Sequence, residues 1–272
     1  MVDTLINIDS AFEDLETVEL VPGRSTLTVH LNGVKYEFIV NIKNDSDKLL
    51  VIGSGAYDPK KHKPPIFHRH TWASDFEEST IFYNDPTLYV GDINIGWGYG
   101  TRDRHYIQEL SSIISLLAKN LQVETDNIVF YGSSCGGFMS ILLAGLFVGS
   151  RAVVNNPQTN VAKYHKTHVD NLYQAVYGES DDDFHKFDLK RIDAIKFFES
   201  THYVPEIVYI QNLASQHDVS NHLVPFIQGL SKLDGEAFKN KVSTIFYHDK
   251  ERGHNPLDKE ETIEFINQAL YK

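Results

Sequence analysis

The chain has 272 residues, of which 42% are hydrophobic and 23% charged, so it is long enough to bury a large core. Its net charge of −12 argues against nucleic acid as a partner, and its single cysteine, Cys135, excludes an internal disulfide and a cysteine-rich metal cage. Because no apolar run is long enough to span a membrane and residues 1–4 lack the pattern of a leader, we expect a cytoplasmic protein without membrane insertion.

A tight hairpin opens the predicted fold. The β-rich runs Leu27–Leu31 and Val34–Val40 flank Asn32 and Gly33, which supply the positive φ angles of a two-residue turn. Further short runs mostly lack alternation, as strands buried on both faces do. These runs cover residues 49–52, 81–83, 88–90, 128–131, 152–154, 207–210 and 244–247.

Helical patterns separate these strands. Apolar residues repeat every three or four positions over Ile107–Leu121 and Ile263–Leu270, and Asn255 and Pro256 have the residue types of a helix cap and first turn. Strand alternating with helix predicts an α/β fold with a mostly parallel sheet covered on both faces. We expect a single domain over residues 1–272.

The segment Asn127–Phe138 has the order of a nucleophile elbow, with a buried strand, a glycine-flanked serine and then a helix. A serine hydroxyl is a weak nucleophile at neutral pH, so an enzyme that uses one exposes it on a sharp turn beside a general base. Gly132 and Gly136 stand two positions before and after Ser134, where small residues let strand and helix pass closely. The alternative is a glycine-rich turn with a purely structural role.

Partners for Ser134 are expected after later strands, because reactive groups gather at the carboxyl ends of a parallel sheet. Asp218 follows the run 207–210, and His254 lies in the turn before the last helix. The order Ser134, Asp218, His254 is that of an α/β-hydrolase, with His254 as the base and Asp218 holding its imidazole. A helix cap is the alternative role for Asp218, and His248 is the rival base. His217 and His222 either line the site or are exposed.

Backbone N–H groups are expected to form the oxyanion hole. The N–H of Cys135 follows the nucleophile, and Gly55 or Ala56 can provide the second, because the run 49–52 leads into small residues that allow close approach. Cys135 could itself be proposed as the nucleophile, but its place one residue past Ser134 directs its side chain away from the site.

A basic segment, residues 60–70, follows the proposed oxyanion loop and contains Lys61 and Lys63. In an acidic chain it suggests an anionic substrate or donor, such as the phosphates of coenzyme A or of a polymer, although a solvated loop explains it equally well. His62, His68 and His70 of this segment lack thiolate or carboxylate ligands at matching spacing, so we expect no metal.

Several motifs together resemble the bacterial capsular polysaccharide O-acetyltransferases built on the α/β-hydrolase fold, those of meningococcal capsules above all. The motifs are Tyr131–Gly137, Asn155–Gln158 with Tyr164 following, Asp218–His222 and the Gly253–His254 turn. The pattern is also similar to the hydrolase-like accessory secretion proteins that acetylate adhesin glycans. The likeness covers most of the chain and is strongest around the elbow.

The resemblance implies that an acetyl group passes from acetyl-CoA to Ser134 and then to a sugar hydroxyl. It also implies that Gln158 extends the triad. In the meningococcal enzymes a lysine follows the nucleophile where this chain has Cys135, so donor or acceptor contacts are expected to differ. The sequence around Arg69 and Trp72 and around Trp97 is expected to line the sugar or CoA site, although core packing also explains tryptophan.

Three functions are therefore compatible with the sequence. The first is an O-acetyltransferase acting on a surface polysaccharide or its precursor, alongside other capsule biosynthesis enzymes. The second is a serine esterase acting on an acylated carbohydrate, which residue spacing does not distinguish from a transferase. The third is a non-catalytic hydrolase-like subunit of a glycan assembly.

Overall fold

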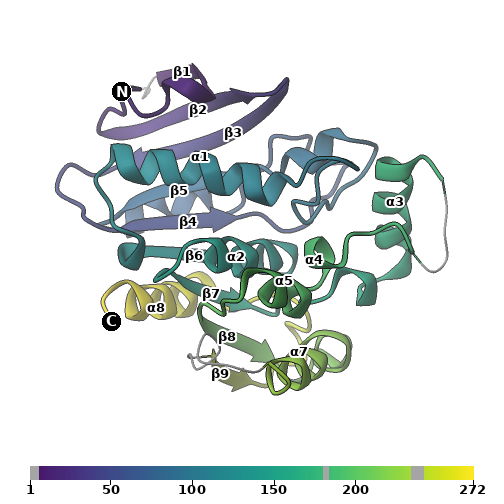
Figure 1. The fold of residues 1–272 in the computed structure, drawn as a ribbon. Coiled ribbons are helices and arrows are strands. Elements are labelled where there is room, and N and C mark those ends of the chain that lie inside the picture. The colour runs from purple at the N-terminus through teal and green to yellow at the C-terminus, as the bar shows by residue number, and fades with distance from the viewer. Residues whose placement is uncertain (1–5, 180–183, 234–241) are drawn as a thin grey trace.

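A mixed sheet forms the centre of the molecule in the computed structural model, which describes residues 6–179, 184–233 and 242–272 (Figure 1). Its strand order is β1-β2-β3-β5-β4-β6-β7-β8-β9. The strands from β5 to β9 in that order are parallel, whereas β3 runs antiparallel to both β2 and β5. The bounds are β1 Ile6–Ala11, β2 Gly23–Leu31, β3 Val34–Ile42, β4 Leu49–Gly53, β5 Ser79–Tyr83, β6 Ile128–Ser133, β7 Arg151–Asn155, β8 Glu206–Asn212 and β9 Val242–Tyr247.

Helices cover both faces of this sheet, as the sequence predicts. The bounds are α1 Tyr106–Asn120, α2 Cys135–Leu146, α3 Lys166–Tyr177, α4 Leu189–Ile192, α5 Ala194–Thr201, α6 Gln216–Asp218, α7 Val224–Leu230 and α8 Lys259–Leu270, with a π-helical segment Val219–Leu223 between α6 and α7. Within the described ranges, no helix combines the length and apolar character needed to cross a bilayer. The arrangement is that of an α/β-hydrolase, and the predicted fold class is confirmed.

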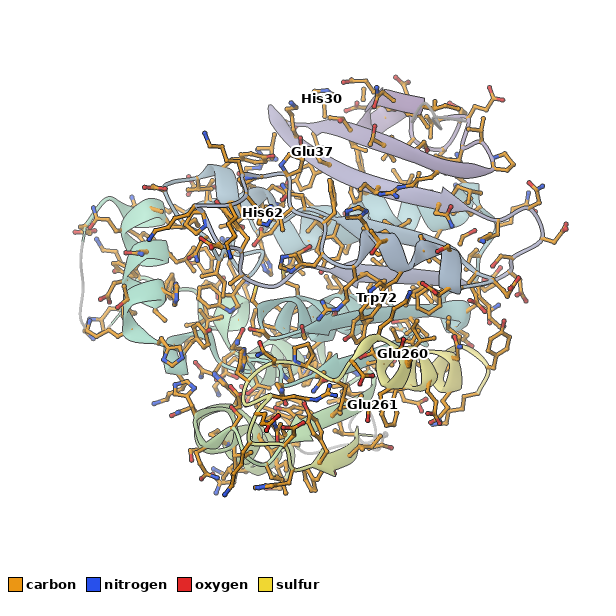
Figure 2. The ribbon with its side chains drawn as sticks, turned by 180° about the vertical axis from the view of Figure 1, so that it is seen from behind. His30, Glu37, His62, Trp72, Glu260 and Glu261 are labelled. Atoms are coloured by element: carbon orange, nitrogen blue, oxygen red, sulfur yellow. The ribbon has the colours of Figure 1, made fainter. Side chains whose placement is uncertain are left out.

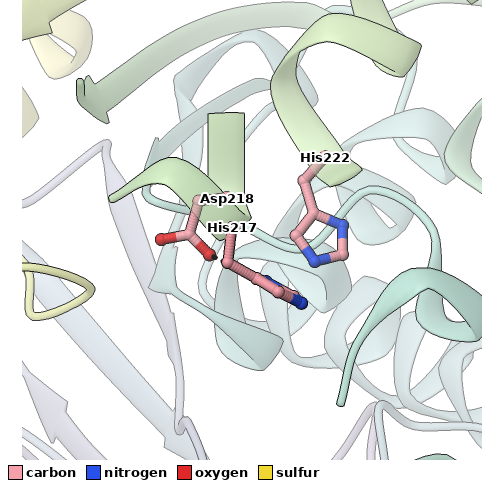
Figure 3. Close-up of side chains that lie close together, drawn as sticks. All are labelled: His217, Asp218 and His222. Carbon is pink, nitrogen blue, oxygen red and sulfur yellow. Dashed lines mark ion pairs between the residues drawn. The ribbon is translucent and has the colours of Figure 1, made fainter. Parts of the chain in front are cut away.

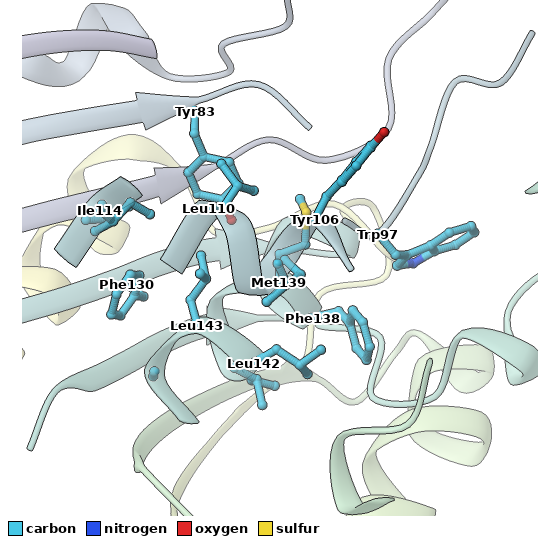
Figure 4. Packing of buried hydrophobic residues seen from close by; sticks show 14 of the residues in the cluster. Tyr83, Trp97, Tyr106, Leu110, Ile114, Phe130, Phe138, Met139, Leu142 and Leu143 are labelled. Carbon is cyan, nitrogen blue, oxygen red and sulfur yellow. The ribbon is translucent and has the colours of Figure 1, made fainter. Parts of the chain in front are cut away.

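Two apolar clusters, one on each face, follow from the alternation of side chains along the strands. In β4, Leu49 and Val51 belong to the cluster that α1 and α2 cover, and Leu50 and Ile52 belong to the cluster under α8. All of these side chains are buried, which explains why the strand has no alternating pattern in the sequence. Figure 4 shows the first cluster, where residues of α1 and α2 pack against the sheet.

The carboxyl ends of the parallel strands meet at one edge of the sheet, to the right in Figure 1. The loops after β4, β6, β8 and β9 therefore lie near one another although they are far apart in the chain. This edge is where the candidate residues gather.

Three local predictions need correction. Residues 88–90 are not a strand: they end the 3₁₀ helix Pro86–Tyr89, which the side chain of Asp85 caps by accepting from the Thr87 N–H at 2.8 Å. The last helix begins at Lys259 with Asp258 as its cap, so Asn255 and Pro256 lie in the preceding turn. The hairpin is not the first element, because β1 precedes it and pairs in parallel with β2. Residues 1–4, on which the leader expectation depends, lie outside the described residues.

Candidate active site

Ser134 lies at the junction of β6 and α2 with a backbone φ of +56° and ψ of −125°. A non-glycine residue with positive φ is strained, and such strain is held in place only where the surroundings enforce it. Here the Ser134 N–H donates to the Asn155 carbonyl at 3.2 Å, and the Ser134 carbonyl accepts from the Phe138 and Gln158 N–H groups at 3.2 Å each. The strand, sharp turn and helix of the predicted elbow are therefore present.

The flanking glycines are required by close packing. A Cβ atom on Gly132 would lie 2.2 Å from the backbone carbonyl of Gly136, and one on Gly136 would lie 2.7 Å from the carbonyl oxygen of Gly53. A Cβ on Gly137 would lie 2.7 Å from the Pro157 side chain. Strand β6, helix α2 and the end of β4 thus meet at separations that only glycine permits.

The structure brings together the three side chains that the sequence singles out. His254 Nε2 lies 2.9 Å from Ser134 Oγ, and His254 Nδ1 lies 2.6 Å from Asp218 Oδ2. Asp218 is 1% exposed, and its Oδ2 also accepts from Ser215 Oγ at 2.5 Å. With the Nδ1 hydrogen held by the carboxylate, Nε2 is free to accept the serine proton, and the buried charge can stabilise the resulting imidazolium. His248, the rival base, is exposed beyond the end of β9.

Two buried asparagines hold the loop that carries His254. Asn156, whose φ is +45°, donates from Nδ2 to the backbone carbonyls of His254 and Asn255 at 3.0 and 3.1 Å. Asn212 donates from Nδ2 to the carbonyl of Gly253 at 2.8 Å, and its own N–H donates to Asn156 Oδ1 at 2.8 Å. Neither role could be read from the sequence, since an asparagine after a strand is an ordinary turn residue.

Gln158 contacts the nucleophile directly. Its side chain is fully buried, and Nε2 donates to Ser134 Oγ at 2.8 Å. Its Oε1 accepts from the indole N–H of Trp97 at 3.2 Å. Trp97 is 0% exposed, so the expectation that it lines a ligand site needs correction: its ring is enclosed by protein and its polar atom is bonded to Gln158.

Gly55, a candidate oxyanion donor, has a hydrogen-bond partner in the structure. Its N–H donates to Nδ1 of His68 at 3.2 Å. Burial, with smaller contributions from Arg69 and His62, lowers the pKa of His68 to about 4, so at neutral pH its ring is uncharged and able to accept. This contact joins residues 13 positions apart and has no signal in the sequence. Ala56 is half-buried on the same loop.

Cys135 is a poor candidate for the nucleophile. Its thiol is buried, and Sγ lies 3.8 Å from the Ser54 carbonyl oxygen. Burial raises the pKa of the Cys135 thiol well above its usual range, so the reactive thiolate is disfavoured. This geometry supports Ser134 over Cys135.

The residues expected to bind substrate lie in different environments. Arg69 donates from Nη2 to Ser133 Oγ at 2.8 Å, and its guanidinium lies 5.3 Å from the centre of the Trp72 ring and 5.4 Å from that of Tyr131. Lys61 and Lys63 are exposed, and Lys61 lies 3.5 Å from a carboxylate oxygen of Asp58. Figure 2 shows His62 of the basic segment and Trp72 on the face opposite α1 and α2. Arg69 thus places a cationic group next to the elbow.

His217 and His222 flank Asp218 and form with it the group that could ligate a metal ion among the described residues (Figure 3). One ligand atom of each lies within 4.8 Å of the others. However, the Thr159 N–H donates to His222 Nδ1 at 3.4 Å, which places the hydrogen of the neutral ring on Nε2. A metal bound at Nε2 of His222 would need the other tautomer, whereas Asp218 could offer Oδ1 and keep Oδ2 on His254. The two imidazoles line the carboxylate of Asp218, and the contact from Thr159 favours the tautomer in which His222 Nε2 carries the hydrogen.

The histidines of the basic segment have other partners. His68 accepts from Gly55, and His70 Nδ1 lies 2.5 Å from Nη2 of Arg24. A different group of imidazoles surrounds the ring of Tyr164, whose centroid lies 4.6 to 6.4 Å from those of His165, His168, His217, His222 and His254. Burial lowers the pKa of His168 and of His217, and lowers that of His222 to about 3. The surroundings of Tyr164 thus include several imidazoles that are neutral at neutral pH.

Comparison of the sequence with models of protein families and with curated proteins finds no match. Comparison with solved structures finds the capsule O-acetyltransferase of Neisseria meningitidis serogroup A, with a TM-score of 0.67 and 18% identity over 96% of this chain and 99% of that chain. Another structure of that enzyme is a complex with CoA. The serine hydrolase FphF of Staphylococcus aureus matches with a TM-score of 0.56 and 14% identity over 92% and 98% of the two chains.

The Glycosylation Associate Protein (Gap123) complex of Streptococcus agalactiae is a further match, with a TM-score of 0.60 and 14% identity over 90% of this chain and 45% of that chain. At these identities the likeness is one of fold. The structural neighbours thus include an acetyltransferase and a serine hydrolase, and the likeness to the meningococcal capsule enzyme expected from the motifs is confirmed over nearly the whole chain. This chain has the α/β-hydrolase fold.

Proposed function

We propose that the protein is an O-acetyltransferase that moves an acetyl group from acetyl-CoA, through an acetyl ester on Ser134, to a hydroxyl of a capsular or other surface polysaccharide. The line of hydrogen bonds from Ser134 Oγ through His254 to Asp218, at 2.9 and 2.6 Å, carries the proposal. The likeness to a capsule O-acetyltransferase supports the choice of acyl donor and acceptor.

The proposed reaction has two steps that use the same residues. In the first, Ser134 Oγ attacks the acetyl carbonyl, His254 Nε2 takes the hydroxyl proton and returns it to the departing CoA thiolate. In the second, a sugar hydroxyl gives its proton to His254 and attacks the acetyl ester, and Ser134 recovers the proton as its bond to the acetyl group breaks. Asp218 stabilises the imidazolium in both steps. The result is ping-pong kinetics.

The remaining residues have supporting roles in the proposal. The N–H groups of Cys135 and of Gly55 or Ala56 would stabilise the oxyanion, and the bond between Gly55 and His68 would have to open if Gly55 is the second donor. Arg69 with Trp72 next to the elbow would contact the substrate. Lys61 and Lys63 would attract the phosphates of CoA or of a polymer.

We place this activity in the cytoplasm, on a polysaccharide or its precursor and alongside other enzymes of capsule assembly, with one domain supplying the whole site. The likeness to a glycosylation-associated complex supports an assembly of this kind. A non-catalytic subunit is the alternative within such an assembly, but it would have no need for the strained serine and its hydrogen-bonded histidine.

A serine esterase is the second candidate, favoured by the likeness to the hydrolase FphF. Both reactions share the acetyl-serine and differ only in whether water or a sugar hydroxyl attacks it. Release of acetate from an acylated carbohydrate, with no transfer to added oligosaccharide, would favour the esterase.

The test is to incubate the purified protein with acetyl-CoA and to follow intact mass and free thiol together. We expect one equivalent of CoA thiol to appear with an acetyl adduct on Ser134. The adduct should accumulate in His254→Ala, because attack by the acceptor needs the base more than residual acylation does. His248→Ala is the matched control, since it removes an exposed histidine outside this site.

Ser134→Ala should give neither adduct nor thiol. An adduct on Cys135, or no adduct with any acyl donor, would contradict the proposed function. Unchanged biological activity of Ser134→Ala in cells would point to the non-catalytic subunit.

A further inference from the structure

Trp97 is joined to Ser134 through the side chain of Gln158. The indole N–H donates to Gln158 Oε1 at 3.2 Å, and Gln158 Nε2 donates to Ser134 Oγ at 2.8 Å. Both side chains are fully buried. Figure 4 shows Trp97 at the end of the buried cluster, beyond Phe138 of α2.

The indole decides which end of the Gln158 amide faces the serine. An indole N–H can only donate, so it pairs with the amide oxygen and turns the amide nitrogen toward Ser134 Oγ. Because Oγ then accepts from Gln158, its own hydrogen is directed to the other neighbour within reach, His254 Nε2 at 2.9 Å. With the amide turned over, Oε1 would compete with His254 for that hydrogen.

The backbone around Trp97 is built to hold this position. Trp97 has a φ of +52°, which is strained for so large a residue. The next residue, Gly98, donates its N–H to Oδ2 of the buried Asp85 at 2.8 Å, and Gly100 donates to Thr87 Oγ1 at 3.0 Å. A Cβ on Gly98 would lie 2.4 Å from the Ile107 side chain. The loop is therefore held by hydrogen bonds to Asp85 and Thr87 and by close packing against Ile107.

We infer that Trp97 is a positioning residue for the nucleophile: its indole N–H sets the orientation of the Gln158 amide and thereby directs the Ser134 hydroxyl hydrogen to His254. The inference rests on Ser134 being the nucleophile of the proposed function. The amide also donates to Oγ while the acetyl-serine bond breaks, so the same orientation stabilises the negative charge that develops on Oγ as His254 returns the proton.

The experiment measures how fast a fluorophosphonate ester labels Ser134, because this needs an activated serine but no identified acceptor. Trp97→Phe should slow labelling at saturating probe by about 10- to 100-fold, since a buried acceptor loses its donor and the amide is free to turn over. The probe concentration at half-maximal rate should stay within about twofold, since probe binding is not the step affected. Tyr36→Phe is the matched control: it also removes the polar group of a fully buried aromatic side chain, one that donates to Glu109 of α1, and it should label at the wild-type rate.

A double-mutant cycle separates positioning from packing. In a Gln158→Leu background the amide is gone, so Trp97→Phe should cause no further loss of labelling rate. Replacing the Trp97 indole by benzothiophene, in the Trp72→Phe protein, removes only the N–H and keeps the ring shape. Relative to the Trp72→Phe protein that keeps the Trp97 indole, it should reproduce the Trp97→Phe loss even if Trp97→Phe folds poorly. Gln158→Glu, whose carboxylate can only accept, should also slow labelling.

The outcomes distinguish this inference from the proposed function. If wild-type Ser134 labels and the benzothiophene protein labels as fast as the Trp72→Phe protein that keeps the Trp97 indole, the inference is wrong and the proposed function stands. If Trp97→Phe slows labelling by the same factor in the Gln158→Leu background as in the wild type, the inference is also wrong, because Trp97 would then act through packing alone. If wild-type Ser134 does not label at all, both fail.

Discussion

Two glycine turns in this molecule serve different purposes. Gly33 closes the hairpin between β2 and β3 with a φ of +78°, and a Cβ on it would meet nothing within 4 Å. Gly132 precedes the elbow with no positive φ, and a Cβ on it would lie 2.2 Å from the backbone of Gly136. The first glycine is needed for its backbone angle and the second for the space it leaves empty. A turn that only reverses the chain is therefore tolerant, whereas the turn that presents Ser134 is not.

The same contrast applies to the polar groups of the two regions. In the hairpin region the ion pair of His30 with Asp9, at 2.9 Å, joins side chains that are 45% and 74% exposed. At the carboxyl edge Asp218 and His222 are almost completely buried. Surface pairs contribute little to stability, while buried groups tolerate few changes of charge. Changes at the carboxyl edge should consequently have the larger effects.

The largest expected effect is that of Gly132→Ala. The new methyl group would overlap the Gly136 carbonyl. Because the atoms that it meets belong to the backbone, strand and helix would have to separate. We expect the free energy of unfolding in urea to fall by about 3 kcal/mol or more, with loss of fluorophosphonate labelling at Ser134. Wild-type stability together with normal labelling would mean that the Gly136 backbone lies farther from Gly132 than a Cβ separation of 2.2 Å.

A smaller effect is expected from His222→Gln, and it should depend on pH. Burial lowers the pKa of His222 to about 3, whereas an unfolded chain gives histidine a pKa near 6.5. Below about pH 6.5 the unfolded state therefore binds a proton that the folded state does not, and stability is lost at about 1.4 kcal/mol per pH unit for this group. His222→Gln should lose less stability than wild type between about pH 6.5 and pH 4.

Urea unfolding between about pH 6.5 and pH 4 measures the difference in the free energy of unfolding between wild type and His222→Gln. This difference reports His222 alone, because both proteins share the other buried histidines and the carboxylates. His30→Gln is the control from the hairpin region, since its imidazole is half exposed. Parallel stability curves for wild type and His222→Gln would show that His222 takes up its proton in the folded protein too.

The elbow and its partners could be predicted because their signals are local. Gly132, Ser134 and Gly136 report a steric requirement that acts over five residues. Asp218 and His254 follow from strand order, since a parallel sheet brings the ends of its strands to one edge. The contacts of His254 with both partners are what that reasoning expects of an α/β-hydrolase.

Other features depend on contacts between distant segments, which a single sequence does not report. The contact of His68 with Gly55 and that of Trp97 with Gln158 depend on how long loops fold back across the edge of the sheet. Local signals can also mislead. Residues 88–90 have the composition of a strand, but Pro86 and the capping side chain of Asp85 favour a 3₁₀ turn.

The smallest expected effect completes the comparison of the two glycines. Gly33→Ala places a methyl group in open space, so its cost is that of a left-handed backbone with a Cβ, about 1 kcal/mol. The free energy of unfolding should fall by that amount, while the rate of Ser134 labelling should not change. A loss of labelling in Gly33→Ala would show that the hairpin is coupled to the elbow through the sheet. Equal losses of stability in Gly33→Ala and Gly132→Ala would mean that backbone angle, rather than closeness of packing, limits both turns.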